Sequence, residues 1–341
     1  MRTGSFPSSA DIINTGRNTT AMRSVSQATP SSPQGASPSL LAIDAGQTGI
    51  KARYRDSEGA AIEWSLPGVR TDLPLMDQLR QVLDDAAARI PRVQLVGFGV
   101  SGLTVAESRP EVLLQAARGL GTDEVTLAHD SITAYLAALK HERGAVVAAG
   151  TGSVTLAVGR RKVARVDGWG NLMGDAGSGY WIGRAAFEAV MCAFDGRGPE
   201  TALLPRLQQD FPQLDAAYIE LQADPGRVKR IASYARSVTE LAATDAVAAG
   251  IVDRAAAELA HAAVTGLRLV EEDTGAAPLV HAVGGVFKAE CTLSAFRHHV
   301  MEALPGAVVT AGHTDALNGA ECLIDLPADS PLRAHLQVAR A

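Results

Sequence analysis

The chain has 341 residues, of which 47% are hydrophobic and 20% charged, and its formal net charge is −6. This length accommodates about two domains with buried cores. A mildly acidic balance argues against a nucleic-acid-binding protein, since such proteins usually carry a basic stripe. The 3 cysteines lie far apart and form no CxxC pair, so neither a zinc site nor a disulfide framework is indicated, and we expect a reduced, cytoplasmic setting.

Residues 1–38 are rich in Ser, Thr, Pro and Gly and nearly free of large apolar side chains. Such a segment buries too little apolar surface to offset its chain entropy, so we predict a disordered N-terminal extension. It lacks the continuous apolar stretch of a secretory signal. An organelle-targeting segment and a chain start at Met22 are alternative interpretations. No later stretch is apolar for long enough to span a membrane, and we therefore expect no membrane partner.

A short Gly turn follows the first apolar strand. The strand begins at Leu40 and ends at Asp44, the turn contains Gly46 and Gly49, and a second strand carries Lys51. Glycines allow a positive φ and let backbone N–H groups converge on an anion, beside which a carboxylate can hold a hydrated Mg²⁺. The stretch therefore predicts a site for nucleotide phosphates in a β-hairpin. An ordinary hairpin turn is the alternative.

The apolar patterns after this hairpin predict the order βββαβαβα, which is typical of an α/β layer with a mixed sheet. The expected strands are 61–64, 93–100, 125–128 and 145–149, and the expected helices are 76–90, 111–120 and 131–141. From Val146 onward the pattern of strand, Gly turn and strand begins again, which favours an internal duplication. We therefore predict two domains that face a cleft, at 39–123 and 124–326, and a peripheral tail at 327–341.

The second half of the chain is predicted to be mostly helical. A Gly-punctuated segment begins at Asp167 and becomes a helix near Gly179. Apolar residues at helical spacing predict further helices at 200–223, 226–240, 245–271, 290–303 and 316–326. Strands are expected at 279–283 and 308–309. We accordingly expect the second domain to carry a helical insertion.

Four apolar strands end in Gly-containing turns, at 44–49 (DAGQTG), 97–102 (GFGVSG), 150–153 (GTGS) and 282–287 (AVGGVF). In this order the chain resembles the superfamily of sugar kinases, actin and heat-shock chaperone ATPases. Over residues 39–325 it is most similar to the N-acetylglucosamine kinase branch and the BadF/BadG/BcrA/BcrD ATPase family, through GWGNLMGDAGSGYWIG at 168–183 and HDS at 129–131. The resemblance implies two ribonuclease-H-like (actin-like ATPase) domains with mixed β-sheets around a central cleft, and a homodimer.

The resemblance also implies a nucleotide site. ATP would be the phosphate donor, with Mg²⁺ anchored through water by Asp44, because phosphoryl transfer depends on positioning and charge neutralisation. Lys51 either adds a positive charge at the phosphates or points to solvent. Two hairpins would cradle the phosphates through backbone N–H groups, and a third Gly pair would lie under the adenosine. The residues concerned are Gly46, Gln47 and Thr48, then Gly150, Thr151, Gly152 and Ser153, and finally Gly284 and Gly285 with Lys288 nearby.

Asp130 is the implied catalytic base, which accepts the proton of the sugar hydroxyl. Its position before a helix is also typical of an N-cap, and the two roles are compatible because one carboxylate oxygen stays free. Trp169 and Asp175 would bind the sugar through an indole face and a carboxylate, although an isolated Trp is usually a core residue. The other expected sugar contacts are the backbone of Gly168 and Gly174, with Asp72 and Ser101 from the facing domain.

Three parts of the chain depart from the family pattern. The family's first loop usually reads DGGGTKT, whereas this chain has Ala45, Gln47, Gly49 and Ile50. The conventional lysine is therefore absent, and Lys51 either replaces it or does not. Ala176 stands where the family motif has a Glu. Asp72 stands where the N-acetylglucosamine enzymes carry Asn, and a carboxylate there would favour a free ammonium, as in glucosamine. ATP use is therefore expected, while the sugar stays open.

Two functions from different classes follow from the resemblance. The first is an ATP-dependent kinase that phosphorylates the 6-hydroxyl of an aminosugar, N-acetylglucosamine first and glucosamine next. The second is an ATPase that activates a redox enzyme, but relatives of that kind bind an iron–sulfur cluster through cysteines, and no cysteine is expected near the Gly turns here. A sugar-responsive regulator would need a DNA-binding domain, which the first 38 residues do not provide. We therefore predict kinase chemistry on a small-molecule aminosugar.

Overall fold

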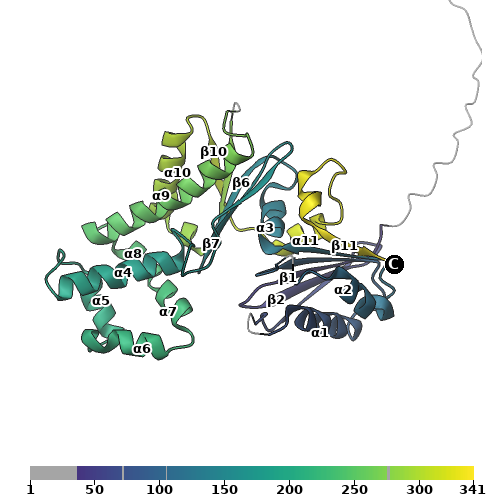
Figure 1. Cartoon of the computed structure of the whole chain (residues 1–341), viewed down its shortest axis with the longest axis horizontal. Helices are drawn as coiled ribbons and strands as arrows, with labels where there is room; N and C mark the ends of the chain where they lie inside the picture. Colours follow the sequence, from purple (N-terminus) through teal and green to yellow (C-terminus); the bar gives the residue numbers. More distant parts are fainter. Residues whose placement is uncertain (1–36, 71–72, 105, 275–276) are drawn as a thin grey trace, which may run out of the picture. The chain divides into compact units, whose positions relative to one another are not determined.

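The computed structural model describes residues 37–70, 73–104, 106–274 and 277–341, which form two mixed β-sheets with their helices (Figure 1). The predicted extension lies outside these residues except for its last two positions. Asp72, predicted to contact the sugar, also lies outside them. Among the described residues, none of the helices combines the length and the apolar character that a membrane crossing requires.

The first sheet has 6 strands in the order β11-β5-β4-β1-β2-β3. Three of them form the antiparallel run β1-β2-β3, while β4 and β5 continue parallel to β1. The short β11 closes the edge antiparallel to β5. The strands are β1 (Leu40–Ala45), β2 (Ile50–Arg55), β3 (Ala61–Leu66), β4 (Leu95–Val100), β5 (Glu124–His129) and β11 (Gln337–Arg340).

The strand pairing of the first sheet crosses both predicted domain boundaries. A boundary between residues 123 and 124 would separate β5 from β4, its parallel neighbour in the same sheet. The tail predicted to be peripheral contributes β11 to this sheet, because the outer edge of β5 offers unpaired backbone groups that a short strand can satisfy. The first sheet therefore draws on both ends of the described chain.

The second sheet has 5 strands in the order β10-β9-β6-β7-β8. Here β6-β7-β8 is antiparallel and β9 and β10 run parallel to β6, so five strands of the first sheet recur in order and direction. The repeat predicted from Val146 onward is thus confirmed at the level of strand order. The strands are β6 (Gly144–Ala149), β7 (Ser153–Val158), β8 (Val163–Val166), β9 (Leu279–Val283) and β10 (Val308–Ala311).

Side chains alternate between the two faces of the first sheet, and both faces are buried. Leu41 and Ile43 of β1 point to one core with α1 (Leu75–Ala87), α2 (Pro110–Ala116) and the 3-10 turn η1 (Ala117–Leu120), whereas Ala42 points to the other face and packs on α11 (Ala316–Cys322). Helix α3 (Asp130–Leu139) packs beside α11. The glycines of GFGVSG serve this packing, since a Cβ at Gly97 would lie 2.6 Å from the carbonyl oxygen of Ala320.

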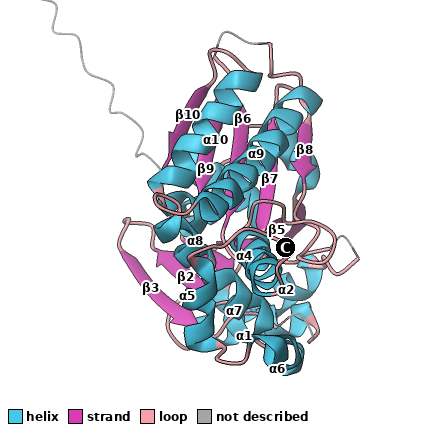
Figure 2. Cartoon of the chain, turned by 90° about the vertical axis from the view of Figure 1, so that its left-hand side faces the viewer, coloured by secondary structure: helices cyan, strands magenta, loops and turns pink. Residues whose placement is uncertain are grey.

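Helix α9 (Ala246–Leu269) lies across β6, β7 and β8 of the second sheet, with α10 (Glu290–Ala303) beside it (Figure 2). The helix predicted over 200–223 is broken, because Pro212 has no N–H to donate and holds Phe211 out of the helical region. The remaining helical elements are α4 (Gly179–Phe194), α5 (Leu203–Asp210), η2 (Leu214–Ala216), α6 (Ala217–Ala223), α7 (Arg227–Ser233), α8 (Ala235–Leu241), η3 (Gly285–Lys288) and η4 (Pro331–His335).

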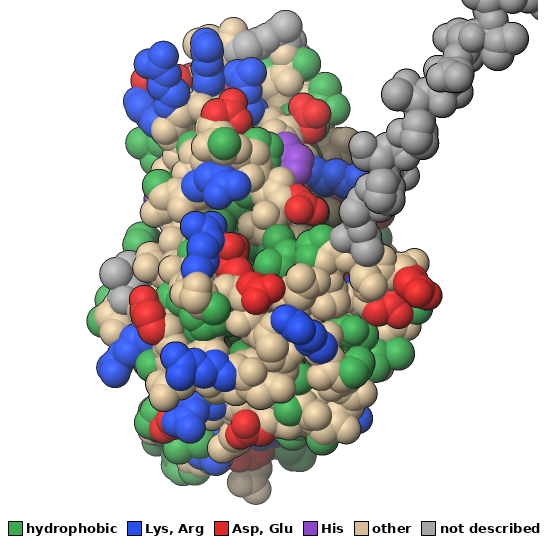
Figure 3. Space-filling model, turned by 90° about the vertical axis from the view of Figure 1, so that its right-hand side faces the viewer, with side chains coloured by type: hydrophobic (Ala, Val, Ile, Leu, Met, Phe, Trp, Pro, Cys, Tyr) green, Lys and Arg blue, Asp and Glu red, His purple; other side chains and the backbone are tan. Residues whose placement is uncertain are grey.

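Charged side chains of both signs are interspersed over the face seen in Figure 3, with several Lys and Arg side chains near its upper end. The expectation that the protein binds no nucleic acid stays a prediction.

Candidate active site

The first Gly hairpin joins β1 to β2 and brings Asp44 opposite Lys51. The two residues are direct partners in the antiparallel register, so their side chains lie on the same face of the sheet. Within the turn the N–H of Gly46 donates to the carbonyl oxygen of Gly49 at 3.2 Å. That N–H is therefore used inside the hairpin, whereas Gln47 and Thr48 are exposed at its tip.

Asp44 lies among other charges. Burial raises the pKa of Asp44 to about 6, the negative charges of Asp130 and Asp315 add to this rise, and the positive charge of Lys51 opposes it. Lys51 is exposed, yet it lies on the side of the sheet that carries Asp44. This placement favours the interpretation in which Lys51 adds a positive charge at the hairpin. A divalent cation would likewise offset these negative charges. Among the described residues no group of three or more His, Cys, Asp or Glu side chains is placed to hold a metal directly, so the water-mediated Mg²⁺ at Asp44 stays a prediction.

The ends of three parallel strands lie in register beside this hairpin. Ala45 of β1 pairs with Val100 of β4, which pairs in turn with His129 of β5. Ser101 follows β4 directly, and its N–H donates to the carbonyl oxygen of Ala45 at 3.0 Å. Asp130 follows β5 directly. The structure therefore places Asp44, Ser101 and Asp130 together at the carboxyl ends of the parallel strands of the first sheet.

Asp130 is the first residue of α3 and does not act as its cap. The cap is His129, whose Nδ1 accepts the N–H of Ser131 at 3.1 Å. The same Nδ1 lies 2.9 Å from Oδ1 of Asp130. The alternative interpretation of Asp130 as an N-cap is therefore wrong, and its carboxylate, with about a third (35%) of the side chain exposed, is available for another role.

The second Gly hairpin joins β6 to β7 and is fixed to the start of α4. The N–H of Gly150 donates to the carbonyl oxygen of Gly152 at 2.8 Å, so this N–H, like that of Gly46, is used inside its own turn. The carbonyl oxygens of Gly150 and Thr151 accept N–H groups of Gly179 at 2.8 Å and of Tyr180 at 3.0 Å. These bonds leave Thr151 exposed at the tip of the hairpin.

A cavity of about 880 Å³ opens beside this hairpin. Four residues predicted to bind the nucleotide line it, namely Gly150, Thr151, Gly285 and Lys288. The other lining residues come chiefly from α4, α7, α8 and the start of α10, and they are Gly179, Ile182, Lys229, Ala232, Ser233, Ala235, Arg236, Thr239, Glu240, Val286, Ala289, Glu290 and Cys291. Volume and lining suit a nucleoside.

Two expectations about this cavity need correction. Gly284 has a φ of 112°, and a Cβ there would overlap the carbonyl oxygen of Ala149. This glycine therefore lets β9 approach β6, while Gly285 borders the cavity. Cys291 also lines the cavity, so the expectation that no cysteine lies near a Gly turn was wrong.

The segment after β8 carries the predicted sugar residues. Trp169 is 60% exposed, so the alternative of a core Trp is wrong, and the guanidinium of Arg165 lies 4.9 Å from the centre of its ring. Asp175 is buried, which raises the pKa of its carboxyl group. A Cβ on Gly152 would lie 2.6 Å from Oδ2 of Asp175, so this carboxylate sits against the second hairpin.

Gly168 and Gly174 have packing roles in this segment. Gly168 has a φ of 78°, a conformation that an L side chain rarely adopts. A Cβ on Gly174 would overlap the carboxylate of Asp167. The structure thus brings Gly152, Ser153 and Asp175 together at the second hairpin.

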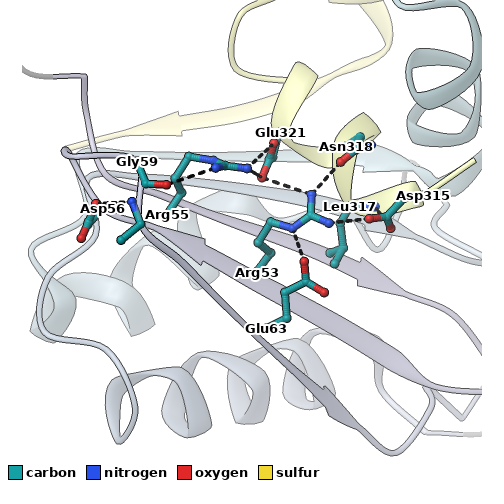
Figure 4. A network of polar contacts seen from close by, with 10 residues as sticks. Arg53, Arg55, Asp56, Gly59, Glu63, Asp315, Leu317, Asn318 and Glu321 are labelled. Carbon is teal, nitrogen blue, oxygen red and sulfur yellow. Dashed lines mark hydrogen bonds and ion pairs between the residues drawn. The ribbon is translucent and has the colours of Figure 1, made fainter.

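Several residues near these groups were missed from the sequence. Arg53 of β2 is 9% exposed and binds Asp315, the N-cap of α11, together with Asn318 and Glu63 (Figure 4). The partners lie in distant parts of the chain and belong to no motif. The same holds for the cavity residues of α7 and α8, since side chains that line a cavity between several helices follow no common spacing.

The order of five strands that the two sheets share, and their Gly hairpins, define the class: an α/β protein with the actin-like ATPase fold. A protein from Chromobacterium violaceum assigned as an N-acetylglucosamine kinase matches with a TM-score of 0.66 at 24% identity, over 84% of this chain and 98% of that chain. A ROK family glucokinase from Streptomyces griseus, solved with glucose and AMPPNP, matches with a TM-score of 0.50 at 17% identity, over 84% and 98% of the two chains. The predicted fold class is confirmed.

Residues 41–321 match the model of the BadF/BadG/BcrA/BcrD ATPase family, and the chain belongs to this family. An N-acetylmuramic acid/N-acetylglucosamine kinase from Clostridium acetobutylicum is 32% identical over 132 residues, which are 38% of this chain and 40% of the relative. An N-acetyl-D-glucosamine kinase from Dictyostelium discoideum is 46% identical over 61 residues, 18% of this chain and 19% of the relative. The matched segments thus span less than half of these relatives.

Proposed function

We propose that the protein is an ATP-dependent kinase that phosphorylates the 6-hydroxyl of an aminosugar, N-acetylglucosamine first and glucosamine next. The observation that carries the proposal is the position of Asp130 at the carboxyl ends of the parallel strands of the first sheet. Its carboxylate lies at the end of β5, the strand beside β4 and Ser101, and it is close enough to Asp44 to raise the pKa of that group. The cap of α3 is His129, so the carboxylate of Asp130 does not have this role. A partly exposed carboxylate at the end of such a strand is suited to accept a hydroxyl proton.

The nucleotide would occupy the cavity beside the second hairpin, with its phosphates at the tips of both hairpins. Thr151, Gly152 and Ser153 would contact phosphates from the second hairpin, and Gln47, Thr48 and Lys51 from the first. Mg²⁺ held through water by Asp44 would neutralise phosphate charge. Gly285 and Lys288 would border the adenosine.

The sugar would lie between Asp130 and the segment after β8. Asp130 takes the proton of the 6-hydroxyl, the oxygen bonds to the γ-phosphorus, and the bond from that phosphorus to ADP breaks. The face of Trp169 would cover the ring, and Asp175 with the backbone of Gly168 and Gly174 would meet its hydroxyls. Asp72 and Ser101 would complete the site.

The proposal is tested by the release of ADP from Mg-ATP with glucosamine, N-acetylglucosamine, N-acetylmannosamine, N-acetylmuramic acid and glucose, with NMR to locate the new phosphate. We expect turnover of an aminosugar, and Asp130→Asn should lose roughly 10² or more in kcat while it still binds ATP. Asp56→Asn, a carboxylate in the turn between β2 and β3, is the matched control. ATP hydrolysis that no sugar stimulates would instead favour the redox-activator alternative. The expected homodimer is tested by light scattering.

A further inference from the structure

Asp167 follows β8 directly and begins the Gly-rich segment. Its carboxylate accepts backbone N–H groups from both ends of that segment: Oδ1 accepts those of Gly168 at 2.7 Å and Asp175 at 2.8 Å, and Oδ2 accepts that of Ala176 at 2.8 Å. Hydrogen bonds to an ionised acceptor are stronger than neutral ones. The side chain therefore closes the segment into a loop.

The backbone conformation of this loop needs such a restraint. Asp167 and Asp175 have φ values of 60° and 57°, which are unfavourable for residues with a Cβ. Both residues take part in the bonds to the Asp167 carboxylate. At Gly174 only a glycine leaves room for that carboxylate. The closed loop thus depends on one side chain and on the glycine that it packs against.

The loop also orients the exposed indole of Trp169. Arg165 donates from its guanidinium to the carbonyl oxygens of Gly168 and, at 3.3 Å, of Asp167, and it stacks on the ring at 4.9 Å. Arg165 thus contacts one face of the Trp169 ring, although 60% of the residue's surface is exposed. Its free face is therefore presented in one direction before any ligand binds.

The closed loop is joined to the second Gly hairpin. The hydroxyl of Ser153 donates to the carbonyl oxygen of Ala176 at 3.0 Å, and the carboxylate of Asp175 lies against Gly152. Ala176 is thus held on both sides, by Asp167 through its N–H and by Ser153 through its carbonyl oxygen. The position of Asp175 relative to the hairpin follows from this link.

We propose that Asp167 is a positioning residue of the sugar site, which holds Trp169 and Asp175 in their binding positions in the absence of sugar. This inference rests on the proposed function. Asp167 need not touch the sugar, since it acts through the loop that it closes. Residues 167–176 do not line the nucleotide cavity, and their link to the second hairpin consists of one hydrogen bond from the Ser153 hydroxyl and the contact of Asp175 with Gly152. We therefore expect ATP binding to depend less on this carboxylate than sugar binding does.

Asp167→Asn tests the proposal, because the amide replaces one acceptor oxygen by an NH₂ group that faces a backbone N–H. We expect the KM for the aminosugar to rise roughly tenfold or more, as the loss of a charge-assisted hydrogen bond implies, and the KM for ATP to change less than about threefold. Asp56→Asn is the matched control, since Asp56 also accepts two backbone N–H groups in a turn. An unchanged sugar KM, or an equal rise of both KM values, would overturn the proposal.

Hydrogen exchange without sugar provides a readout that does not depend on turnover. In Asp167→Asn the amides of residues 168–176 should exchange at least about tenfold faster, with β1 and β6 unchanged, and Asp56→Asn should leave the loop protected. Equal protection in both variants would refute the role of Asp167. Arg165→Lys provides a second variant, expected to raise the sugar KM by a smaller factor. If the unaltered protein phosphorylates no aminosugar, the proposed function fails, while the exchange measurement still tests the role of Asp167.

Discussion

The Nδ1 atom of His129 lies 2.9 Å from Oδ1 of Asp130 and 3.1 Å from the backbone nitrogen of Ser131. Nδ1 can accept the N–H of Ser131 only when it carries no proton. It can donate to Asp130 only when it does. Capping of α3 and contact with the proposed base therefore compete for one nitrogen.

His129→Ala should destabilise the protein by about 1 kcal/mol, because α3 loses its N-cap. His129→Asn should keep most of that stability, since Asn is a favoured cap whose oxygen can accept the N–H of Ser131. Urea unfolding of both variants measures the difference. Equal losses would show that the capping bond contributes little and that His129 stabilises the protein by packing alone.

Arg53→Met should destabilise the protein by roughly 2–4 kcal/mol, because it removes the cation that the partly buried carboxylate of Asp315 contacts and leaves the partly buried Glu321 with Arg55 alone. Arg53 contacts Glu63 at 2.7 Å, Glu321 at 3.4 Å and also Asp315, which ties β2 and β3 to α11. Arg55→Met is the matched control: Arg55 contacts the same Glu321, but 41% of its side chain is exposed. The control should lose less than about 1 kcal/mol. Comparable losses in the two variants would contradict this account.

The Gly hairpins and the succession of strands and helices along the chain were predictable because their signals are local. An apolar run followed by Asp44 and a Gly turn predicts a strand and hairpin at any place in a chain. The repeat of that pattern from Val146 then predicts the second sheet. Even the parallel neighbours β4 and β5 follow from helices long enough to cross over.

The polar partners were not predictable because tertiary packing chooses them. Arg53 and Asp315 are 262 residues apart, and neither belongs to a motif. Asp167 stands directly before the motif that it closes, yet an Asp after a strand has many possible acceptor roles. β11 was missed because its 4 residues contain too few apolar side chains for a pattern, and the open edge of β5 determines its pairing.

Asp44→Asn should make the stability of the protein less dependent on pH. The pKa of Asp44 is raised from 3.8 to about 6, so the folded state binds this proton more tightly than the unfolded chain. The stability that the proton contributes is complete below about pH 4 and is lost as the pH rises through 6. At pH 7.5, without nucleotide and metal, the variant should be more stable by roughly 1–3 kcal/mol, and at pH 5 the gain should be smaller. A gain that does not change with pH would contradict the assignment.

Substitutions at the adjacent Gly284 and Gly285 should separate packing from nucleotide binding. Gly284→Ala places a Cβ in a left-handed conformation and against Ala149, so we expect a loss of about 2 kcal/mol or more in stability. A Cβ at Gly285 would have no atom within 4 Å, and the leucine side chain of Gly285→Leu would extend from a residue that lines the cavity. It should leave the melting temperature within a few degrees while it weakens ATP binding about tenfold or more. Calorimetry of ATP binding and thermal unfolding measure the two effects, and unimpaired ATP binding by Gly285→Leu would place the adenosine outside this cavity.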